Sequence, residues 1–441
     1  MKGGKIVGEG VDGCVFSEPM WPCAAGTQVG SKVPPSPLDP KYVSKILSKD
    51  DNEATYIQAA ERIMGPELSL IHLTHFGGEC KPADSKHLPT KEEFPAFSKG
   101  LSSTIFWEKT DQACAELKNR INKKEDITNS KKLVFISRYP ITAIDWFRIN
   151  TSKTKPVAAL TRMVVKAIPP FLNALQRLYQ NRKEQFIHID LHLGNIFVSP
   201  SPADSIQFGM SDFGRCFLRQ RSDGLGDFVR FLTQDMMEYT VFSGYVQIPL
   251  EVRILNYILQ RVPSSEEISP KNIVYNWVKE VNKPRGTDFI MMHLVSLTIY
   301  LLEKPLFIQM IETLRGLARK VRSYYETETD IESSMTDNEK AVLEYMLITY
   351  LSISPINSIL QGFIAISSPE LYNQARETLK SHFPGNELKE SFTGVEIIVE
   401  YLFRMISGPY IHEGSSLAVA VRSMQMVDIR YVWSDIVSSD A

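Results

Sequence analysis

The sequence lacks an excess of charge of either sign, because 49 lysine and arginine residues stand against 51 aspartate and glutamate residues and the formal net charge is -2. Proteins that coat nucleic acids carry a large positive charge, so this general role is excluded and no nucleic-acid partner is expected. With 43% hydrophobic and 23% charged residues, the composition is that of a folded globular protein. Any partner bound through charge must therefore recognise a local site.

Long apolar runs are also scarce. Residues 289–302 are strongly apolar but span only 14 positions, whereas a transmembrane helix needs about 20. Residues 345–369 carry no charge, but Pro355, Asn357 and Gln361 interrupt their apolar pattern, so we expect two buried helices there. The first residues, MKGGKIVGEGVDG, contain no apolar core of a secretory signal. These features predict a protein that lacks a membrane span and stays in the cytoplasm.

Cysteine is rare and shows neither metal-binding nor redox spacing. There is no CxxC pair, and the five residues are spread along the chain: Cys14, Cys23, Cys80, Cys114 and Cys216. An odd and scattered set is typical of free thiols in a reducing compartment, which agrees with the expected cytoplasmic location.

The distribution of apolar residues predicts a small β-rich N-terminal part followed by a large helical part, an α+β fold class. Strands are expected within residues 4–16, on either side of a glycine-containing turn, and over residues 41–47 and 131–139. Acidic residues followed by apolar positions at helical spacing predict a helix over residues 50–64, which the next Gly-Pro pair should end.

Two segments interrupt the N-terminal part. Residues 19–40 contain six prolines and are expected to form an irregular surface loop. Residues 77–132 are polar, and we expect an elaborate loop with a helix near residues 111–122. A helix over residues 157–179 then leads into the second part.

Nearly every periodic segment after residue 225 is helical. The expected helices cover residues 226–239, 249–261, 270–281, 289–302, 306–325, 336–353, 369–382 and 394–406. The basic stretch at residues 315–322 is either a docking surface or a solvated helix face, and the second interpretation is favoured.

The segment GEGVDGCV, at residues 8–15, matches the pattern G-x-G-x-x-G-x-V at every specified position. Its three glycines permit a tight turn between two strands and let backbone N–H groups approach phosphate oxygens without a side chain in the way. A glycine-bearing hairpin without any ligand has the same pattern, so both interpretations stay open. The last glycine opens a strand, whereas in a dinucleotide-binding fold it opens a helix.

Lys45 lies within the predicted strand KYVSKIL. An exposed face residue is the ordinary interpretation, but a strand lysine that follows a glycine-rich hairpin can also pair with nucleotide phosphates. In that case a carboxylate from the next helix is expected to hold the ammonium group. Glu53, eight residues later, is our candidate for this carboxylate, and Glu61 is the alternative.

The stretch FIHIDLHLGNIF, at residues 186–197, places Asp190 between two histidines and Asn195 five residues after that aspartate. His188 and His192 have the i and i+4 spacing of zinc ligands on a helix. The glycine and the following Ile-Phe-Val run instead indicate a loop and a strand. Such a loop suits a carboxylate that orients or deprotonates a hydroxyl and an amide oxygen that binds a metal ion. His188 is then expected to brace the loop.

Asp212 opens an Asp-Phe-Gly tripeptide 17 residues after Asn195. A turn aspartate is the ordinary interpretation of so short a match. The intervening residues, however, predict a hairpin that returns Asp212 to the vicinity of Asn195. Two oxygen ligands at one point suit a magnesium ion bound to phosphates.

The chain resembles the protein kinase superfamily in the order of its motifs. These are the glycine-rich turn, the strand lysine, the helix glutamate, H-x-D-x-x-x-x-N and D-F-G. The resemblance covers residues 4–240 and implies a bilobal fold with an N-lobe at residues 1–140, a C-lobe at residues 141–330 and an additional helical region at residues 331–441. The beginning of the chain looks most like the serine/threonine kinase-like proteins of large nucleocytoplasmic DNA viruses. This likeness implies a location in the virion or in a viral factory of the host cytoplasm.

The resemblance also implies roles for the candidate residues. Lys45 would bind the phosphates of ATP and pair with Glu53, Asp190 would be the catalytic base, and Asn195 and Asp212 would bind Mg²⁺. The nucleotide-binding turn would consist of Gly8, Gly10, Gly13 and Val15. The implied partners are ATP, protein substrates and other virion proteins.

Two departures from the family pattern concern the phosphoryl acceptor. Where protein kinases usually have a lysine that meets the transferred phosphate, two residues after Asp190, this chain has His192, and DLHLGN is similar to aminoglycoside and choline kinases. Only 15 residues separate Asp212 from Asp227, with no A-P-E segment between them, so the peptide-docking segment is short. A serine/threonine protein kinase is favoured, with a small-molecule phosphotransferase and a catalytically silent kinase-like scaffold or virion component as alternatives.

Overall fold

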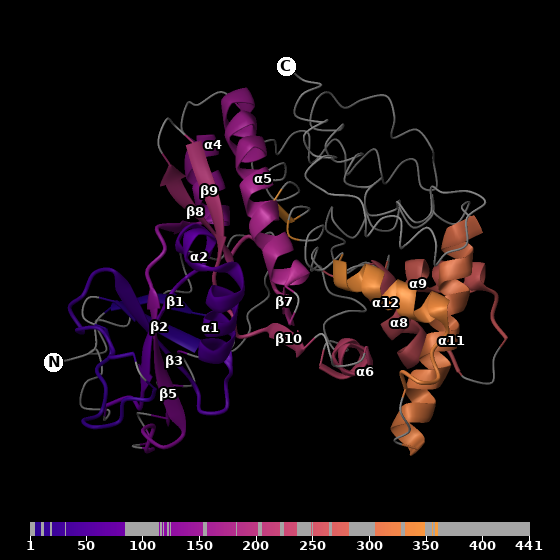
Figure 1. The fold of residues 1–441 in the computed structure, drawn as a ribbon, viewed down its shortest axis with the longest axis horizontal. Coiled ribbons are helices and arrows are strands. Elements are labelled where there is room, and N and C mark those ends of the chain that lie inside the picture. The colour runs from indigo at the N-terminus through magenta and orange to yellow at the C-terminus, as the bar shows by residue number, and fades with distance from the viewer. Residues whose placement is uncertain are drawn as a thin grey trace. The chain divides into compact units, whose positions relative to one another are not determined.

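Figure 1 shows the fold, which comes from a computed structural model. The structure describes residues 5–9, 13–17, 20–30, 32–83, 125–152, 157–181, 183–201, 205–220, 225–235, 250–263, 267–281, 305–327 and 331–348, together with a few isolated positions. Two compact units are present: an N-terminal unit of Met1–Pro140 and Gly209–Cys216, and a C-terminal unit of Ile141–Phe208 and Phe217–Ala441.

A five-stranded antiparallel sheet forms the centre of the N-terminal unit, with the strand order β1-β2-β3-β5-β4. The strands are β1 (Lys5–Glu9), β2 (Gly13–Ser17), β3 (Tyr42–Ser48), β4 (Phe76–Cys80) and β5 (Lys131–Ser137). Five consecutive residues of β3 are buried, as expected for a central strand that is covered on both faces. Helix α1 (Glu53–Met64) follows β3 and buries Ile57, Ala60 and Ile63 at helical spacing.

One local prediction for this unit is confirmed and one is wrong. Helix α1 ends at Met64, directly before the Gly-Pro pair, as predicted. Gly65 turns the chain at φ 78°, and Pro66 begins a separate helix, α2 (Pro66–His72). Proline suits the first turn of a helix, where its missing N–H is not needed. Residues 77–80, expected to lie in a polar loop, instead belong to strand β4 (Phe76–Cys80), in which alternate positions are buried. Two glycines and a glutamate hide this strand pattern in the sequence.

The expectation of free thiols is wrong for four of the five cysteines. Cys14 forms a disulfide with Cys114, and Cys23 forms one with Cys80, whereas Cys216 is a buried free thiol. The partners lie 100 and 57 residues apart, so only the tertiary fold brings them together. Because disulfides persist in oxidising surroundings, the cysteines no longer support a reducing compartment.

The proline-rich excursion, residues 20–40, is irregular but held against the sheet. The Trp21 side chain is fully buried, and its indole Nε1 donates a hydrogen bond to the carbonyl of Ala83 at 3.1 Å. The backbone N–H of Trp21 donates to Oγ of Ser44 in β3 at 2.8 Å. Together with the Cys23–Cys80 disulfide, these contacts make the excursion part of the folded unit, so a surface loop is an incomplete description.

The C-terminal unit contains two small sheets and most of the helices. One sheet has the order β6-β8-β9 and the other pairs β10 with β7. The strands are β6 (Ile141–Thr142), β7 (Glu184–His188), β8 (Ile196–Ser201), β9 (Ser205–Met210) and β10 (Cys216–Gln220). The helices are α4 (Ala143–Ser152), α5 (Val157–Gln180), α6 (Gly226–Arg230), the π-helical turn η3 (Phe231–Asp235), α8 (Leu250–Arg261), α9 (Pro270–Val281), α11 (Pro305–Thr327) and α12 (Asp337–Ile348).

Antiparallel sheets together with these helices confirm the α+β fold class. The helices predicted at residues 289–302, 369–382 and 394–406 lie outside the described residues, as does nearly all of the chain after residue 348. Within the part of the chain that the structure describes, no helix is both long enough and apolar enough for a membrane span.

The basic stretch at residues 315–322 belongs to α11 and is largely used inside its unit. The guanidinium group of Arg322 donates to three carbonyl oxygens at the end of α8, at 2.6 to 3.0 Å. Nζ of Lys320 lies 2.6 Å from Oε2 of Glu339. Arg322 therefore caps the end of α8 and Lys320 pairs with a glutamate of its own unit. These two side chains form neither a docking surface nor a solvated helix face.

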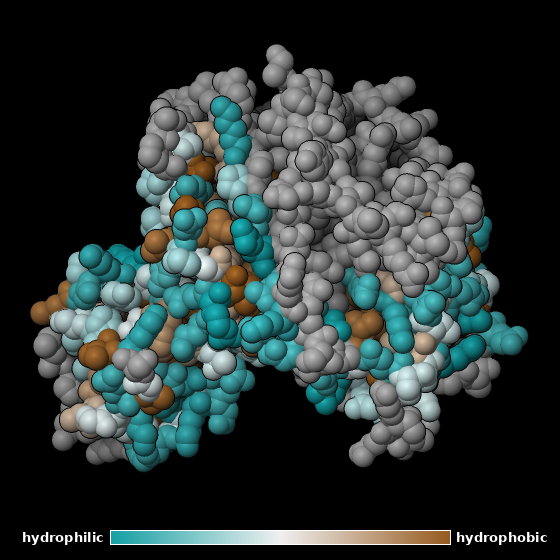
Figure 2. Space-filling view, viewed as in Figure 1, coloured by the Kyte–Doolittle hydropathy of each residue, from teal (hydrophilic) through white to brown (hydrophobic). Residues whose placement is uncertain are grey.

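The visible face of the N-terminal unit is mainly hydrophilic, with separate apolar spots (Figure 2). Among the described residues of this unit, the exposed large apolar side chains are Val29, Val33, Leu38 and Leu70. Single exposed apolar residues are common on soluble domains and need no partner to explain them.

Candidate active site

Lys45 lies in the middle of β3, and its side chain is buried. β3 pairs with β2 on one side and with β5 on the other, where Val15 and Val134 are the neighbours of Lys45. A buried ammonium group is costly unless carboxylates pair with it. Because Lys45 is only 5% exposed, the ordinary interpretation of an exposed strand lysine is wrong.

Gly13 opens β2 directly beside this side chain. A Cβ at position 13 would lie 2.6 Å from Cε of Lys45 and 2.7 Å from Cδ2 of Leu47. Position 13 therefore requires glycine as long as the lysine keeps its path along the sheet. Gly8 pairs with Val15 in the β1–β2 hairpin, and Gly10 lies outside the described residues.

Two carboxylates hold the ammonium group of Lys45. Its Nζ lies 2.7 Å from Oε2 of Glu53 and 2.6 Å from Oδ1 of Asp212. Glu53 belongs to the first turn of α1, and Asp212 follows β9, so three distant segments of the N-terminal unit meet at one charge. Glu61, the alternative carboxylate, bonds instead with His75 and with the backbone of the following residue.

Burial determines how this group ionises. Glu53 is fully buried, and desolvation raises the pKa of its carboxyl to about 7 although the charge of Lys45 opposes the shift. Burial alone would lower the pKa of Lys45, but the charges of Asp212 and Glu53 outweigh it and raise the pKa above its usual value. Among the described residues, Oε1 of Glu53 has no hydrogen-bond partner. A pair desolvated this strongly adds little stability, so stability does not explain its presence.

Asp212 has an unusual backbone conformation. Its φ of 58° is the only positive value for a non-glycine residue in the described part of the chain. Such a conformation costs on the order of 1 kcal/mol and persists when the surroundings fix it. The next side chain, Phe213, is fully buried, and Thr74 N–H donates to the carbonyl of Met210 at 3.1 Å. The Asp212 side chain is 39% exposed, so a carboxylate that binds Lys45 also faces solvent.

The segment around Asp190 is a strand end followed by a loop. β7 ends at His188 and β8 begins directly after Asn195. Nδ2 of Asn195 donates to the backbone carbonyl of Asp190 at 2.9 Å and lies 3.4 Å from its carboxylate Oδ2. The amide group of Asn195 therefore orients the aspartate. The interpretation as two zinc ligands on a helix is wrong, because the segment is not helical.

Both histidines accept backbone hydrogen bonds through Nδ1. Asp190 N–H donates to His188 at 3.3 Å, so His188 braces the loop. Gly194 N–H donates to His192 at 3.0 Å. With Nδ1 as an acceptor, the neutral imidazole of His192 carries its proton on Nε2. Within the described residues, no cluster of three histidine, cysteine, aspartate or glutamate side chains is arranged to hold a metal ion.

Gly194 is a site residue that the sequence did not reveal. A Cβ on this residue would lie 2.7 Å from Cε1 and 3.0 Å from Nδ1 of His192. Glycine at this position therefore lets the imidazole ring lie against the backbone of its own loop. In the sequence, the glycine between His192 and Asn195 indicates only a loop.

The candidate residues form two groups. Lys45, Glu53 and Asp212 meet in the N-terminal unit, and Asp190, His192 and Asn195 share one loop of the C-terminal unit. Because the two units are described separately, the predicted proximity of Asn195 to Asp212 stays a prediction.

No protein-family model and no curated protein sequence matches this chain. The resemblance to protein kinases consequently depends on its motifs and on the geometry of these two groups.

Proposed function

We propose that the chain is an ATP- and Mg²⁺-dependent kinase that transfers the γ-phosphoryl group to serine or threonine hydroxyls of proteins. In this proposal the two units are the lobes of a protein kinase-like fold. The observation that carries it is the buried Lys45 ammonium group, held at 2.7 Å by Glu53 and at 2.6 Å by Asp212. This arrangement holds an ammonium group in a fixed position beside Gly13 of β2, which suits the binding of nucleotide phosphates.

The residues present fit the nucleotide and its metal ion. Gly13 lets the Lys45 side chain run directly against the backbone of β2, and in this proposal Asp212 and Asn195 would supply the oxygen donors that Mg²⁺ prefers. When bound, Mg²⁺ neutralises charge on the phosphates. Lys45 binds phosphate oxygens in this proposal, while Glu53 keeps its ammonium group in place.

Asp190 is the proposed general base. Its carboxylate is oriented by the Asn195 amide and accepts the proton of the acceptor hydroxyl. His192, whose Nδ1 accepts the Gly194 N–H, donates a hydrogen bond from Nε2 to the transferred phosphoryl group, where the family pattern has a lysine. Catalysis then consists mainly of positioning and charge stabilisation.

The proposal is tested with purified protein, labelled ATP, Mg²⁺ and protein acceptors. Wild type should transfer label to serine or threonine, and Lys45→Met should lose at least about a hundredfold in rate. Lys49→Met, at an exposed position at the end of the same strand region, is the matched control and should keep the wild-type rate. Nucleotide binding without transfer to any acceptor would instead support a catalytically silent scaffold.

A small-molecule phosphotransferase is the second candidate. It is favoured by the DLHLGN loop and by the short connection after Asp212, in which β10 already occupies five residues before α6 begins. Parallel assays with protein acceptors and with small aminoalcohol or aminoglycoside acceptors distinguish the two. Transfer to small hydroxyl compounds alone would replace the protein kinase proposal.

A further inference from the structure

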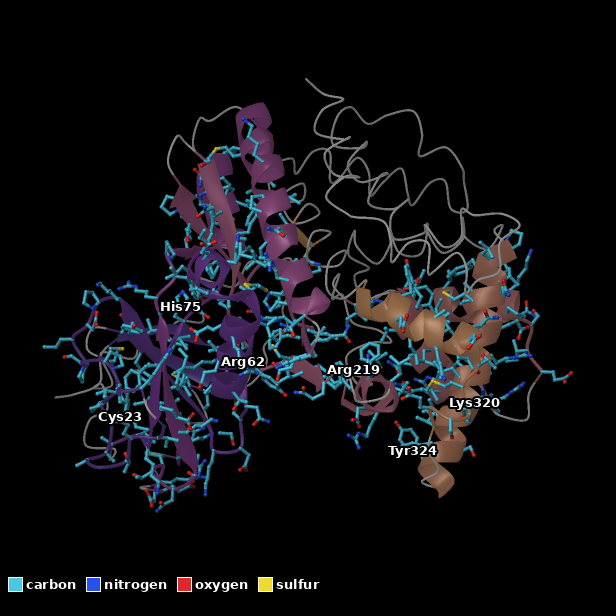
Figure 3. All side chains as sticks on the ribbon, in the orientation of Figure 1. Cys23, Arg62, His75, Arg219, Lys320 and Tyr324 are labelled. Carbon is cyan, nitrogen blue, oxygen red and sulfur yellow. A yellow bond between two sulfur atoms is a disulfide. The ribbon has the colours of Figure 1, made fainter. Side chains whose placement is uncertain are left out.

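Glu61 lies at the centre of a second polar cluster in the N-terminal unit. Its Oε1 accepts the backbone N–H of Phe76 at 3.1 Å and lies 3.0 Å from Nδ1 of His75, which is labelled in Figure 3. Its Oε2 lies 3.6 Å from Nζ of Lys32. Burial would raise the pKa of Glu61, but these partners outweigh it and lower the pKa. The carboxylate therefore ties α1 to the start of β4 and to the proline-rich excursion.

Lys32 reaches this cluster from the excursion. Its Nζ donates to the carbonyl of Phe76 at 2.8 Å and stands 5.4 Å from the centre of the Phe76 ring. The excursion is anchored along β4, because the N–H of Val29 donates to the carbonyl of Glu79 at 2.9 Å. Gly78 has φ +143°, and a Cβ there would lie 3.0 Å from the backbone of the excursion. This close approach to β4 requires glycine.

The Cys23–Cys80 disulfide closes the same contact covalently. Cys23, also labelled in Figure 3, belongs to the excursion, and Cys80 is the last residue of β4. Lys32 is therefore presented to Glu61 by a segment that is bonded to the sheet, and it is not the end of a loose loop.

The Glu61 cluster lies on the helix that carries Glu53. The two glutamates of α1 are separated by about 12 Å along its axis. Because a short helix is stiff, contacts that hold it at Glu61 limit the movement of Glu53 near its other end. We propose that Glu61 and Lys32 are positioning residues that hold α1 so that Glu53 meets Lys45. This inference rests on the proposed kinase function.

Hydrogen exchange tests the structural half of the proposal without any activity assay. Glu61→Ala should speed the exchange of backbone amides in α1 at least tenfold. Glu67→Ala, an exposed glutamate on α2, is the matched control and should leave the exchange unchanged. Equal exchange of α1 in both variants overturns the proposal.

Kinetics test the functional half. Glu61→Ala should lower kcat at least tenfold. Glu61→Gln, which removes the charge of the carboxylate, and Lys32→Met, which removes the ion pair and the hydrogen bond to the Phe76 carbonyl, should each lower it two- to fivefold. The Glu61→Gln/Lys32→Met double variant should lose less than the product of the two single effects, because the two variants share the Glu61–Lys32 contact. Faster exchange with an unchanged kcat would show that Glu61 does not position the site. If the wild type transfers no phosphoryl group, the proposed function fails, while hydrogen exchange still decides whether Glu61 holds α1.

Discussion

Replacing Lys45 should change the ionisation of Glu53 in a way that can be followed with pH. In the wild type the Glu53 pKa is raised to about 7, so above pH 7 the carboxylate is charged and Lys45 is its partner. In Lys45→Met the carboxyl group stays buried without this cation and keeps its proton to higher pH. The folded variant then binds one proton more than the folded wild type. Above pH 7 its free energy of unfolding should therefore fall by about 1.4 kcal/mol per pH unit relative to the wild type.

A double-mutant cycle isolates this effect. Urea unfolding is measured for the wild type, Lys45→Met, Glu53→Gln and the double variant at pH 6, 7, 8 and 9. Below pH 7 the coupling free energy between the two positions should be nearly constant, because Glu53 is protonated in both folded states. From pH 7 to pH 9 it should grow by about 2.7 kcal/mol, two pH units at 1.36 kcal/mol each. A coupling free energy that does not change with pH would refute the buried ion pair.

Three further predictions concern other parts of the molecule. Gly194→Ala should displace the imidazole of His192, because the added Cβ would meet the ring. The loss of one hydrogen-bond donor to the phosphoryl group in the transition state should lower kcat about a hundredfold in steady-state kinetics. An unchanged kcat would show that the His192 ring has no role in catalysis. The pKa of Glu61 is lowered in the folded protein, so the Glu61 carboxylate stabilises the fold above the usual pKa of 4.5, and this stabilisation is lost as the pH falls. Glu61→Gln should therefore lower the urea midpoint at pH 7 but not at pH 3. Equal losses at both pH values would contradict this assignment. Replacing both Cys23 and Cys80 by serine should lower the free energy of unfolding by about 4 kcal/mol, from the entropy of the 57-residue loop that the disulfide closes, and an unchanged urea midpoint would argue against the disulfide.

Local features were predictable from the sequence. The apolar β-branched pattern around Lys45 predicted β3, and apolar positions three apart predicted α1, because both patterns follow from burial of one face or both faces of a single element. Glu53 was preferred over Glu61 because it lies closer in sequence to the strand lysine, and the structure pairs Lys45 with Glu53.

Long-range features were not predictable. Cys23 and Cys80 meet only because the excursion follows β4, and nothing in their spacing indicates that contact. The strand β4 itself was missed, because Gly77 and Gly78 lower strand propensity while close packing against Tyr42 and the excursion requires them. Such positions are chosen by tertiary contacts, which a single sequence does not display.

The most direct test of the proposed function is the initial rate of phosphoryl transfer from labelled ATP, measured for the wild type, Asp190→Asn and the exposed control Asp337→Asn. Asparagine keeps the size of the side chain and its hydrogen bonding but cannot accept the proton of the acceptor hydroxyl. We expect phosphoserine or phosphothreonine from the wild type and the control, and a loss of about 10² to 10⁴ in rate for Asp190→Asn. A wild type that modifies no acceptor, or an Asp190→Asn variant with the full rate, would contradict the proposed function.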